Sequence, residues 1–308
     1  MSNLKQLQST NTSKEYQKQF DNGGIYDWWF TDDNYSTWSH NICLKDYEKF
    51  FKAISPSKFL ILGDGKGVKE GRFIKKLGHH VTSTDLVDIW LKSAKVHNHI
   101  DEYAVQDMEN LTYDDNQFEY SLVKESLHHL QRPYKAIYEM YRVSSKGIII
   151  IEPNDINFHV DINKYNFETD VGNFKYEFSL NELMKCSYGL DIKTVAYTFT
   201  NHPEEKYVKD YLASLPRSGS EFIMNSEKYY QDIKSRNLNL DEMSRKRLPL
   251  ISFIIFKKEP SKAEIKGLRE RGFTIEKLKD NPIHNKKCIV PTIDKVEHKS
   301  FIDVSNLI

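Results

Sequence analysis

One pattern in this sequence points most directly to a ligand-binding site. It consists of three glycines within five residues, followed by a carboxylate at the end of the next apolar run. Gly63, Gly65 and Gly67 follow the apolar run Phe59–Leu62, and Asp85 ends the run after it. Glycines have no Cβ, so the backbone can turn sharply and a ligand can approach its N–H groups. Asp85 can accept two hydrogen bonds from a ribose diol. The pattern predicts a site for the nucleoside end of NAD, FAD or S-adenosylmethionine.

The elements that must position these residues alternate between strand and helix. A helix over Val68–Leu77 would direct its unpaired N–H groups at a ligand in the glycine turn. Pro133 suits the first turn of a helix to about Val143, and Ser179 with Glu182 forms a capping box. Strands are expected at 59–62, 81–84, 103–105, 120–123, 147–151, 191–199 and 250–257. Such alternation predicts an α/β, Rossmann-like, seven-stranded and mostly parallel sheet with helices on both faces, and a helical insertion before the last strand.

Polar residues at the ends of three further expected strands narrow the choice of ligand. Asp107 follows the third strand and can accept a hydrogen bond from an exocyclic amine, while Met108 can pack on a purine face. A charged segment with His128 and His129 follows the fourth strand, and Glu152–Asp155 ends the fifth. The carboxyl ends of parallel strands meet at one edge of a sheet, which is where ligands of such sheets bind.

From Phe59 to Asp155 the chain resembles the class I S-adenosylmethionine-dependent methyltransferases, in particular bacterial members whose first motif reads Leu-Gly-Asp-Gly-Lys-Gly. The family often has an acidic residue where this chain has Ile61, and Asp64 is expected to take over contact with the ligand ammonium. The resemblance implies S-adenosylmethionine as the cofactor. It also implies the following contacts: Gly63, Gly65 and Gly67 with the methionine and ribose parts, Asp85 with the ribose hydroxyls, Leu86 beside the adenine, Asp107 and Met108 at the adenine amine, and Lys124 near the methionine end.

The candidate catalytic residues lie on the expected acceptor side of the site. The sulfonium makes the methyl carbon electrophilic, so the protein has chiefly to align the acceptor, and a hydroxyl acceptor also needs a base. His128 and His129 are the candidate bases, because imidazole titrates near working pH. Glu152 and Asp155 are the candidate carboxylates at the rim, and Asn154 lies between them on the same rim. The alternatives are that the histidines cap a helix or pack under the cofactor, and that the carboxylates are only solvated.

Composition excludes several other classes of protein. Lys plus Arg and Asp plus Glu both number 44, which gives no overall electrostatic sign of a nucleic-acid or membrane partner. The three cysteines form no C-x-x-C pair and are expected to be free thiols, and no ligand spacing suggests a metal site. No signal peptide or apolar run of membrane-spanning length is present, which predicts a cytoplasmic protein. The oligomeric state is left open, with a dimer as one alternative.

Three regions are expected along the chain. Residues 1–58 are expected to form an aromatic-rich, helical or lid-like amino-terminal region with a loose start. Residues 59–259 would form a methyltransferase domain with a helical cap at 203–249 over the acceptor, and residues 260–308 a carboxyl-terminal extension. The predicted function is methyl transfer to oxygen or nitrogen of a small molecule or a saccharide. The alternatives are an NAD(P)-dependent oxidoreductase and a cofactor-binding subunit without catalysis.

Overall fold

The computed structural model describes residues 3–21, 30, 35–156, 166–168, 172–200 and 220–279. Contacts group Met1–Leu278 into one unit, and the fold described below belongs to it. The predicted domain boundaries stay predictions. The aromatic stretch at 26–29 lies outside the described residues, as do the first part of the predicted cap and most of the carboxyl-terminal extension.

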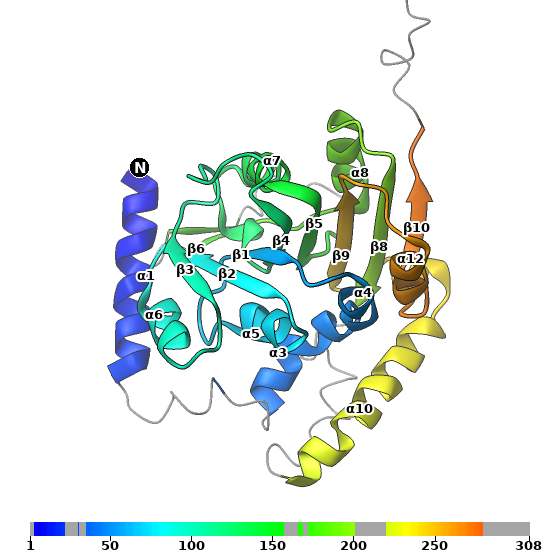
Figure 1. The fold of residues 1–308 in the computed structure, drawn as a ribbon, viewed down its shortest axis with the longest axis horizontal. Helices are drawn as coiled ribbons and strands as arrows, with labels where there is room; N and C mark the ends of the chain where they lie inside the picture. The colour runs from blue at the N-terminus through cyan, green and yellow to red at the C-terminus, as the bar shows by residue number, and fades with distance from the viewer. Residues whose placement is uncertain are drawn as a thin grey trace, which may run out of the picture. The chain divides into compact units, whose positions relative to one another are not determined.

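An eight-stranded mixed sheet forms the centre of this unit (Figure 1). In spatial order its strands are β10 (Thr274–Lys277), β8 (Thr194–Thr200), β9 (Leu250–Phe256), β5 (Ser144–Pro153), β4 (Phe118–Lys124), β1 (Lys58–Leu62), β2 (His80–Asp85) and β3 (Glu102–Val105). The pairs β3–β2, β2–β1, β1–β4 and β4–β5 are parallel. The pairs β5–β9, β9–β8 and β8–β10 are antiparallel. The α/β class and the predominance of parallel pairs are confirmed, but seven strands was wrong. The extra strand, β10, is short and mostly exposed, so its sequence has no apolar run that would mark it.

Helices cover both faces of the sheet, as predicted (Figure 1). On one face lie α4 (Glu48–Ala53), α5 (Lys69–Lys76), α6 (Ile89–Val96) and α12 (Lys262–Arg269), and on the other lie α7 (Pro133–Val143) and α8 (Leu180–Gly189). The remaining described elements are α1 (Asn3–Asp21), α3 (Tyr35–Lys45), η1 (Leu127–His129), α10 (Ser220–Leu238), α11 (Glu242–Arg245) and the hairpin β6 (Asn166–Glu168) to β7 (Asn173–Lys175). Pro133 at the start of α7 and the Ser179–Glu182 capping box are confirmed.

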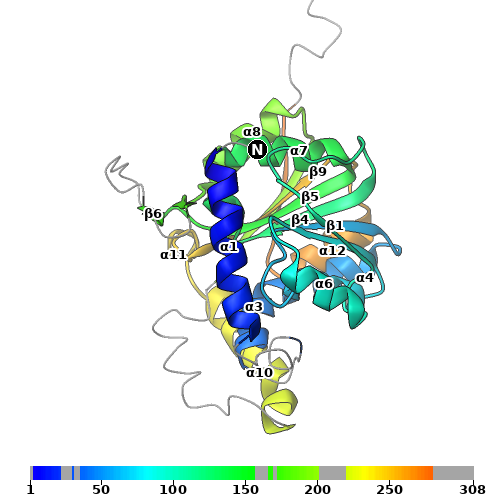
Figure 2. The same ribbon diagram turned by 90° about the vertical axis from the view of Figure 1, so that its left-hand side faces the viewer.

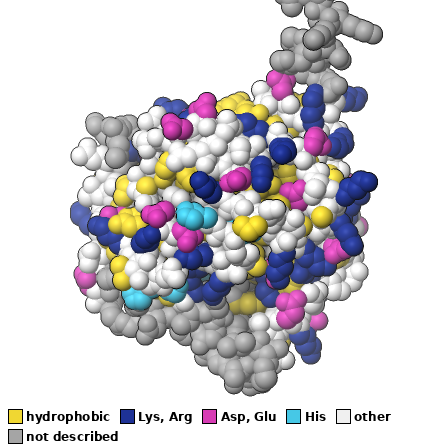
Figure 3. Space-filling model, in the orientation of Figure 1, with side chains coloured by type: hydrophobic (Ala, Val, Ile, Leu, Met, Phe, Trp, Pro, Cys, Tyr) yellow, Lys and Arg dark blue, Asp and Glu magenta, His cyan; other side chains and the backbone are white. Residues whose placement is uncertain are grey.

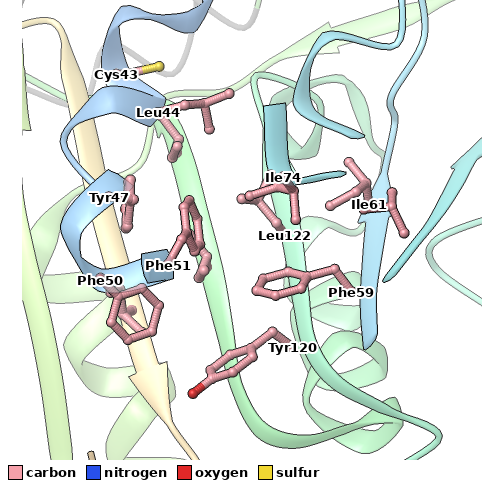
Figure 4. Packing of buried hydrophobic residues seen from close by; sticks show 14 of the residues in the cluster. Cys43, Leu44, Tyr47, Phe50, Phe51, Phe59, Ile61, Ile74, Tyr120 and Leu122 are labelled. Atoms are coloured by element: carbon pink, nitrogen blue, oxygen red, sulfur yellow. The ribbon is translucent and has the colours of Figure 1, made fainter. Parts of the chain in front are cut away.

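Alternate residues of β1 pack into two separate hydrophobic cores. Phe59 and Ile61 face the core under α4 and α5, whereas Leu60 and Leu62 face the core under α7. On the first face an aromatic cluster joins helix and sheet (Figure 4). Phe59 stacks on Tyr120 with ring centroids 5.3 Å apart, and Phe51 meets Phe59 edge to face at 5.7 Å. These contacts fix β1, and with it the start of the glycine loop, between β4 and the helical layer.

The start of the chain was wrongly expected to be loose, because residues 3–21 form α1. The described part of the predicted cap is helical, in α10 and α11. In the parts of the chain that the structure describes, no helix combines the length and apolarity that a membrane crossing requires. Cys43 and Cys186 are buried free thiols, and Cys288 lies outside the described residues.

A buried carboxylate fastens α10 to the rest of the unit. Asp46, which is 1% exposed, lies in the turn between α3 and α4. It accepts hydrogen bonds from the Tyr230 hydroxyl at 2.7 Å and the Thr200 hydroxyl at 3.0 Å, and its Oδ1 is 2.8 Å from Lys234 Nζ. A buried carboxylate needs such partners, because burying an unpaired charge is costly. Asp46 therefore joins α10, β8 and the α3–α4 turn at one point.

The capping box of α8 leads to a stability prediction. Ser179 Oγ accepts a hydrogen bond from Glu182 N at 3.2 Å, and the Glu182 carboxylate accepts one from Ser179 N at 2.9 Å. Ser179→Ala removes the acceptor and is expected to lower the free energy of unfolding by about 1 kcal/mol. Ser179→Gly is the matched control, because glycine at this position is expected to lower the free energy of unfolding by only a few tenths of about 1 kcal/mol. Urea denaturation of both variants checks this, and equal losses would contradict the capping role.

Candidate active site

The turn between β1 and α5 requires glycine at two positions. Gly63 and Gly67 have φ angles of 67° and 80°, in the left-handed region that glycine enters without strain. A Cβ on Gly63 would also lie 2.4 Å from Ser126 Oγ. Val68, a β-branched residue, has a φ of 46° as it leads into α5. A left-handed valine is strained, and such strain concentrates at functional sites.

Asp64 is directed under this turn and holds it in place. Its carboxylate is 1% exposed and accepts hydrogen bonds from Ser83 Oγ at 2.5 Å and from Gly71 N at 3.0 Å. Burial, together with the nearby negative charge of Glu70, raises the pKa of Asp64 well above its ordinary value. Asp64 thus links the turn to β2 and α5. Its contact with a ligand ammonium stays a prediction.

Asp85 stands at the carboxyl end of β2 and lies against the same turn. A Cβ on Gly65 would be 2.9 Å from Asp85 Oδ2, so only a glycine leaves room at this point. Asp85 Oδ1 accepts a hydrogen bond from Val87 N at 3.2 Å. Burial raises the pKa of Asp85 to about 6. Gly65 and Asp85, with Leu86 next in the chain, lie together at this edge of the sheet, and their contacts with a cofactor stay predictions.

Asp107 and Met108 follow β3 on the same side of the sheet. The Met108 methyl carbon would lie 3.2 Å from a Cβ on Gly63, so this side chain reaches the glycine turn. Asp107 Oδ1 accepts a hydrogen bond from Glu109 N at 3.0 Å and lies 3.2 Å from Lys5 Nζ. The structure therefore places Met108 beside the first motif glycine and Asp107 beside α1. The sequence pattern had no signal for Lys5.

Lys124 ends β4 with its side chain buried among carboxylates. Its Nζ lies 2.5 Å from Glu125 Oε2 and 3.5 Å from Glu70 Oε1. Burial acts against the charged form, but the two carboxylates outweigh it and raise the pKa of Lys124. The Lys124 carbonyl accepts a hydrogen bond from Ser126 Oγ at 3.2 Å. Glu125 has a φ of 47°, a second left-handed residue at this edge.

His128 and Glu152 form a hydrogen-bonded pair between η1 and the end of β5. His128 Nδ1 is 2.7 Å from Glu152 Oε2, and the Glu152 side chain is fully buried whereas that of His128 is 13% exposed. Glu152 Oε1 accepts hydrogen bonds from Ser126 N at 2.9 Å and Leu127 N at 2.8 Å. Because the carboxylate can only accept, Nδ1 carries the proton and Nε2 of a neutral ring is left with its lone pair. The pair thus has the geometry of a general base with a carboxylate that orients it.

His129 and Asp155 occupy different surroundings from this pair. His129 Nδ1 donates to the Phe174 carbonyl at 3.0 Å, which ties η1 to β7, and its ring centroid is 3.9 Å from that of His128. Asp155 N donates to the Phe178 carbonyl at 3.1 Å. Asn154, between Glu152 and Asp155, belongs to the rim predicted from the sequence. Its Nδ2 donates to the Lys246 and Leu248 carbonyls at 2.9 and 2.7 Å, so the chain after α11 borders this rim.

No cluster of three or more His, Cys, Asp or Glu side chains with a metal-binding arrangement occurs within the described ranges.

On the face shown in Figure 3, Lys and Arg side chains gather near α12 and β10, with carboxylates among them. This mixture defines no surface of one charge on that face.

Part of the chain matches a known protein family. Residues 62–151 match a family model described as a methyltransferase domain, a range that includes the glycine turn, Asp85, Asp107 and both histidines but ends before Glu152. No curated protein gives a significant match to the chain. Similar solved structures include a protein from Thermotoga maritima described as a SAM-dependent methyltransferase and possible histamine N-methyltransferase. It is 19% identical in sequence, the match covers 79% of this chain and 99% of that chain, and the TM-score is 0.46. Another is a SAM-dependent methyltransferase from Archaeoglobus fulgidus, with 18% identity, 70% and 91% covered, and a TM-score of 0.45.

The match to the family model supports a methyltransferase domain over residues 62–151. It does not favour the oxidoreductase alternative.

Proposed function

We propose that this protein transfers the methyl group of S-adenosylmethionine to a hydroxyl oxygen of a small molecule or a saccharide. The observation that carries the choice of oxygen is the His128–Glu152 pair. A neutral amine can attack a methyl carbon without first losing a proton, whereas a hydroxyl gains from a base in the transition state. A histidine oriented by a fully buried carboxylate provides that base.

The residues around the glycine turn fit the donor. Gly63 and Gly65 leave the space that a Cβ would fill, and Asp85 offers carboxylate oxygens next to Gly65 for a ribose diol. Asp107 and Met108 would meet the adenine, and the Lys124 carbonyl would lie near the methionine end. Asp64 supports the turn through Ser83 and Gly71, and its contact with the ligand ammonium stays a prediction.

The donor supplies an activated methyl group, and the protein has to align the acceptor and accept its proton. Residues at the carboxyl ends of β4 and β5 would hold the acceptor hydroxyl in line with the carbon–sulfur bond, which can contribute roughly 7–11 kcal/mol of the barrier. As the new carbon–oxygen bond forms and the carbon–sulfur bond breaks, His128 Nε2 would accept the hydroxyl proton. Glu152 would stabilise the resulting imidazolium through Nδ1. His129 and Asp155 would border the acceptor.

A ligand-binding experiment tests the donor assignment. Addition of S-adenosylhomocysteine at 100 times its dissociation constant is expected to stabilise the protein by about 2.7 kcal/mol, read as an upward shift of the melting temperature. NAD and NADP at the same concentration serve as controls and are expected to give no shift. A shift with NAD and none with S-adenosylhomocysteine would contradict the proposal and favour an oxidoreductase.

An acceptor screen tests the catalytic part. Release of S-adenosylhomocysteine is measured with sets of hydroxyl-bearing and amine-bearing small molecules and saccharides, and the proposal expects turnover with hydroxyls. Turnover with amines alone would overturn the choice of oxygen. Binding without turnover across both sets would favour a cofactor-binding subunit. The cytoplasmic location and the lack of a nucleic-acid partner stay predictions from the sequence, and the oligomeric state stays open.

A further inference from the structure

Helix α1 lies along the candidate donor site and contacts Asp107, Leu86 and the surroundings of Gly65. Figure 2 views the molecule from the side on which α1 lies. Lys5 Nζ is 3.2 Å from Asp107 Oδ1, and Ser9 Oγ is 3.4 Å from the Leu86 carbonyl oxygen. Both partners belong to the expected adenine side. One face of α1 therefore follows the line along which the cofactor would extend.

Tyr16, two turns after Ser9, reaches the ribose side of the site. A Cβ on Gly65 would lie 2.2 Å from the Tyr16 hydroxyl oxygen and 2.9 Å from Asp85 Oδ2, so both oxygens lie against the same glycine. Burial and the negative charge of Asp85 raise the pKa of Tyr16 well above its ordinary value, in agreement with this position. A ribose hydrogen-bonded to Asp85 and packed on Gly65 would need the space in which the Tyr16 hydroxyl lies.

Charged and polar groups hold α1 in this position. Lys5 is 2% exposed and also lies 3.3 Å from Glu109 Oε1, while the second oxygen of Glu109 is 2.7 Å from Arg132 Nε. Gln8 Nε2 donates to the Gly172 carbonyl at 2.8 Å and to the His129 carbonyl at 3.2 Å. The same helix thus touches the donor side through Lys5 and the candidate acceptor side through Gln8.

We infer that α1 is an intrasteric strap, which fills the donor site through Lys5, Ser9 and Tyr16 and has to leave these positions when the cofactor binds. This inference rests on the proposed function, because it takes Gly65, Asp85 and Asp107 as donor-binding residues. Strap and cofactor compete for the same groups, so the apparent affinity for the cofactor is the intrinsic affinity multiplied by the fraction of molecules with α1 released. Release also removes the Gln8 contact with His129, so donor binding alters the acceptor side.

The test uses the direction in which cofactor affinity changes when α1 is attached less firmly. If α1 blocks the site, weakening its attachment tightens cofactor binding; if α1 closes over a bound cofactor and holds it, the same change weakens binding. Lys5→Gln removes the charge that faces Asp107 and Glu109, and Tyr16→Ala removes the group against Gly65. Lys18→Gln, an exposed lysine of the same helix, is the matched control.

Titration calorimetry with S-adenosylhomocysteine is expected to show roughly 5- to 10-fold tighter binding for Lys5→Gln and for Tyr16→Ala, and no change for Lys18→Gln. Hydrogen exchange of the full-length wild-type protein gives a readout that needs no variant. Amides of residues 3–21 are expected to exchange faster when S-adenosylhomocysteine is bound.

Unchanged or weaker binding by both variants, or slower exchange of residues 3–21 with ligand, would overturn the strap while leaving the proposed function intact. Failure of the wild type and of every variant to bind S-adenosylhomocysteine would overturn the proposed function, and the strap with it. Binding by the variants when the wild type shows none would support both.

Discussion

Replacing Glu152 by glutamine is expected to slow methyl transfer by a factor of about 10²–10⁴, the usual contribution of a general base, while leaving the affinity for S-adenosylhomocysteine unchanged. A glutamine can keep one oxygen on the amides of Ser126 and Leu127, so the loop is retained. Its amide nitrogen then faces His128 Nδ1 and can only donate. The imidazole must place its proton on Nε2, and its lone pair no longer faces the acceptor.

The rate is measured with the best acceptor from the screen, and ligand affinity by calorimetry. His128→Ala is expected to lose as much rate as Glu152→Gln, and the double variant little more, because the two residues act as one unit. Asp155→Asn, at the same rim but outside the pair, is the comparison variant and is expected to have the smaller effect. A Glu152→Gln enzyme with wild-type rate would show that the pair is structural only.

Replacing Asp85 by asparagine is expected to weaken binding of S-adenosylhomocysteine about 10- to 100-fold, because hydrogen bonds to a charged acceptor contribute roughly 1.5–3 kcal/mol. The same change is expected to stabilise the free protein at pH 8 by about 3 kcal/mol. Burial raises the pKa of Asp85 from 3.8 to about 6. The folded state therefore favours the protonated form, and the stability that this group contributes is present below pH 3.8 and lost as the pH rises through 6.

Urea denaturation at pH 8 and at pH 4 separates this effect from general damage. The variant is expected to exceed the wild type at pH 8 and to match it at pH 4, since the wild-type side chain is then neutral as well. Ligand binding by the wild type is expected to weaken as the pH falls below 6, and the variant to show no such loss. Asp88→Asn, which removes a 33% exposed carboxylate that pairs with Lys92 at the start of α6, is the control. Loss of stability at both pH values would show that the Asp85 carboxylate is needed by the fold.

Periodicity and turn chemistry could predict the centre of the molecule, because those signals are local. The apolar run before Gly63 and the positions of Pro133 and Ser179 each correspond to an element of the structure. The edge strand β10 could not be found in this way, since Thr274–Lys277 is short and gains its partners only by pairing with β8. Helix α1 has no clear apolar face, and its position depends on contacts such as Lys5 with Asp107, which lie about a hundred residues apart along the chain.

The site residues divide in the same way. The motif placed Gly63, Gly65 and Asp85 at one edge, as parallel strands require. It could not show that Asp64 points beneath the turn, nor that Glu152 is buried and holds His128, because these depend on side-chain directions across neighbouring elements. Tyr16 had no local signal at all, and its position against Gly65 follows from tertiary packing alone.

The hydrogen bonds of the buried Asp46 carboxylate have a consequence for the order in which the chain folds. Its hydrogen bonds to Thr200 and Tyr230 join residues 154 and 184 positions apart. Closing loops of that length loses chain entropy before any bond is gained, so such contacts form late and slow the search for the native state. We therefore expect α10, which reaches Asp46 through Tyr230, to dock late in folding and to detach early in partial unfolding. Limited proteolysis that cuts first within residues 220–238 would agree with this expectation.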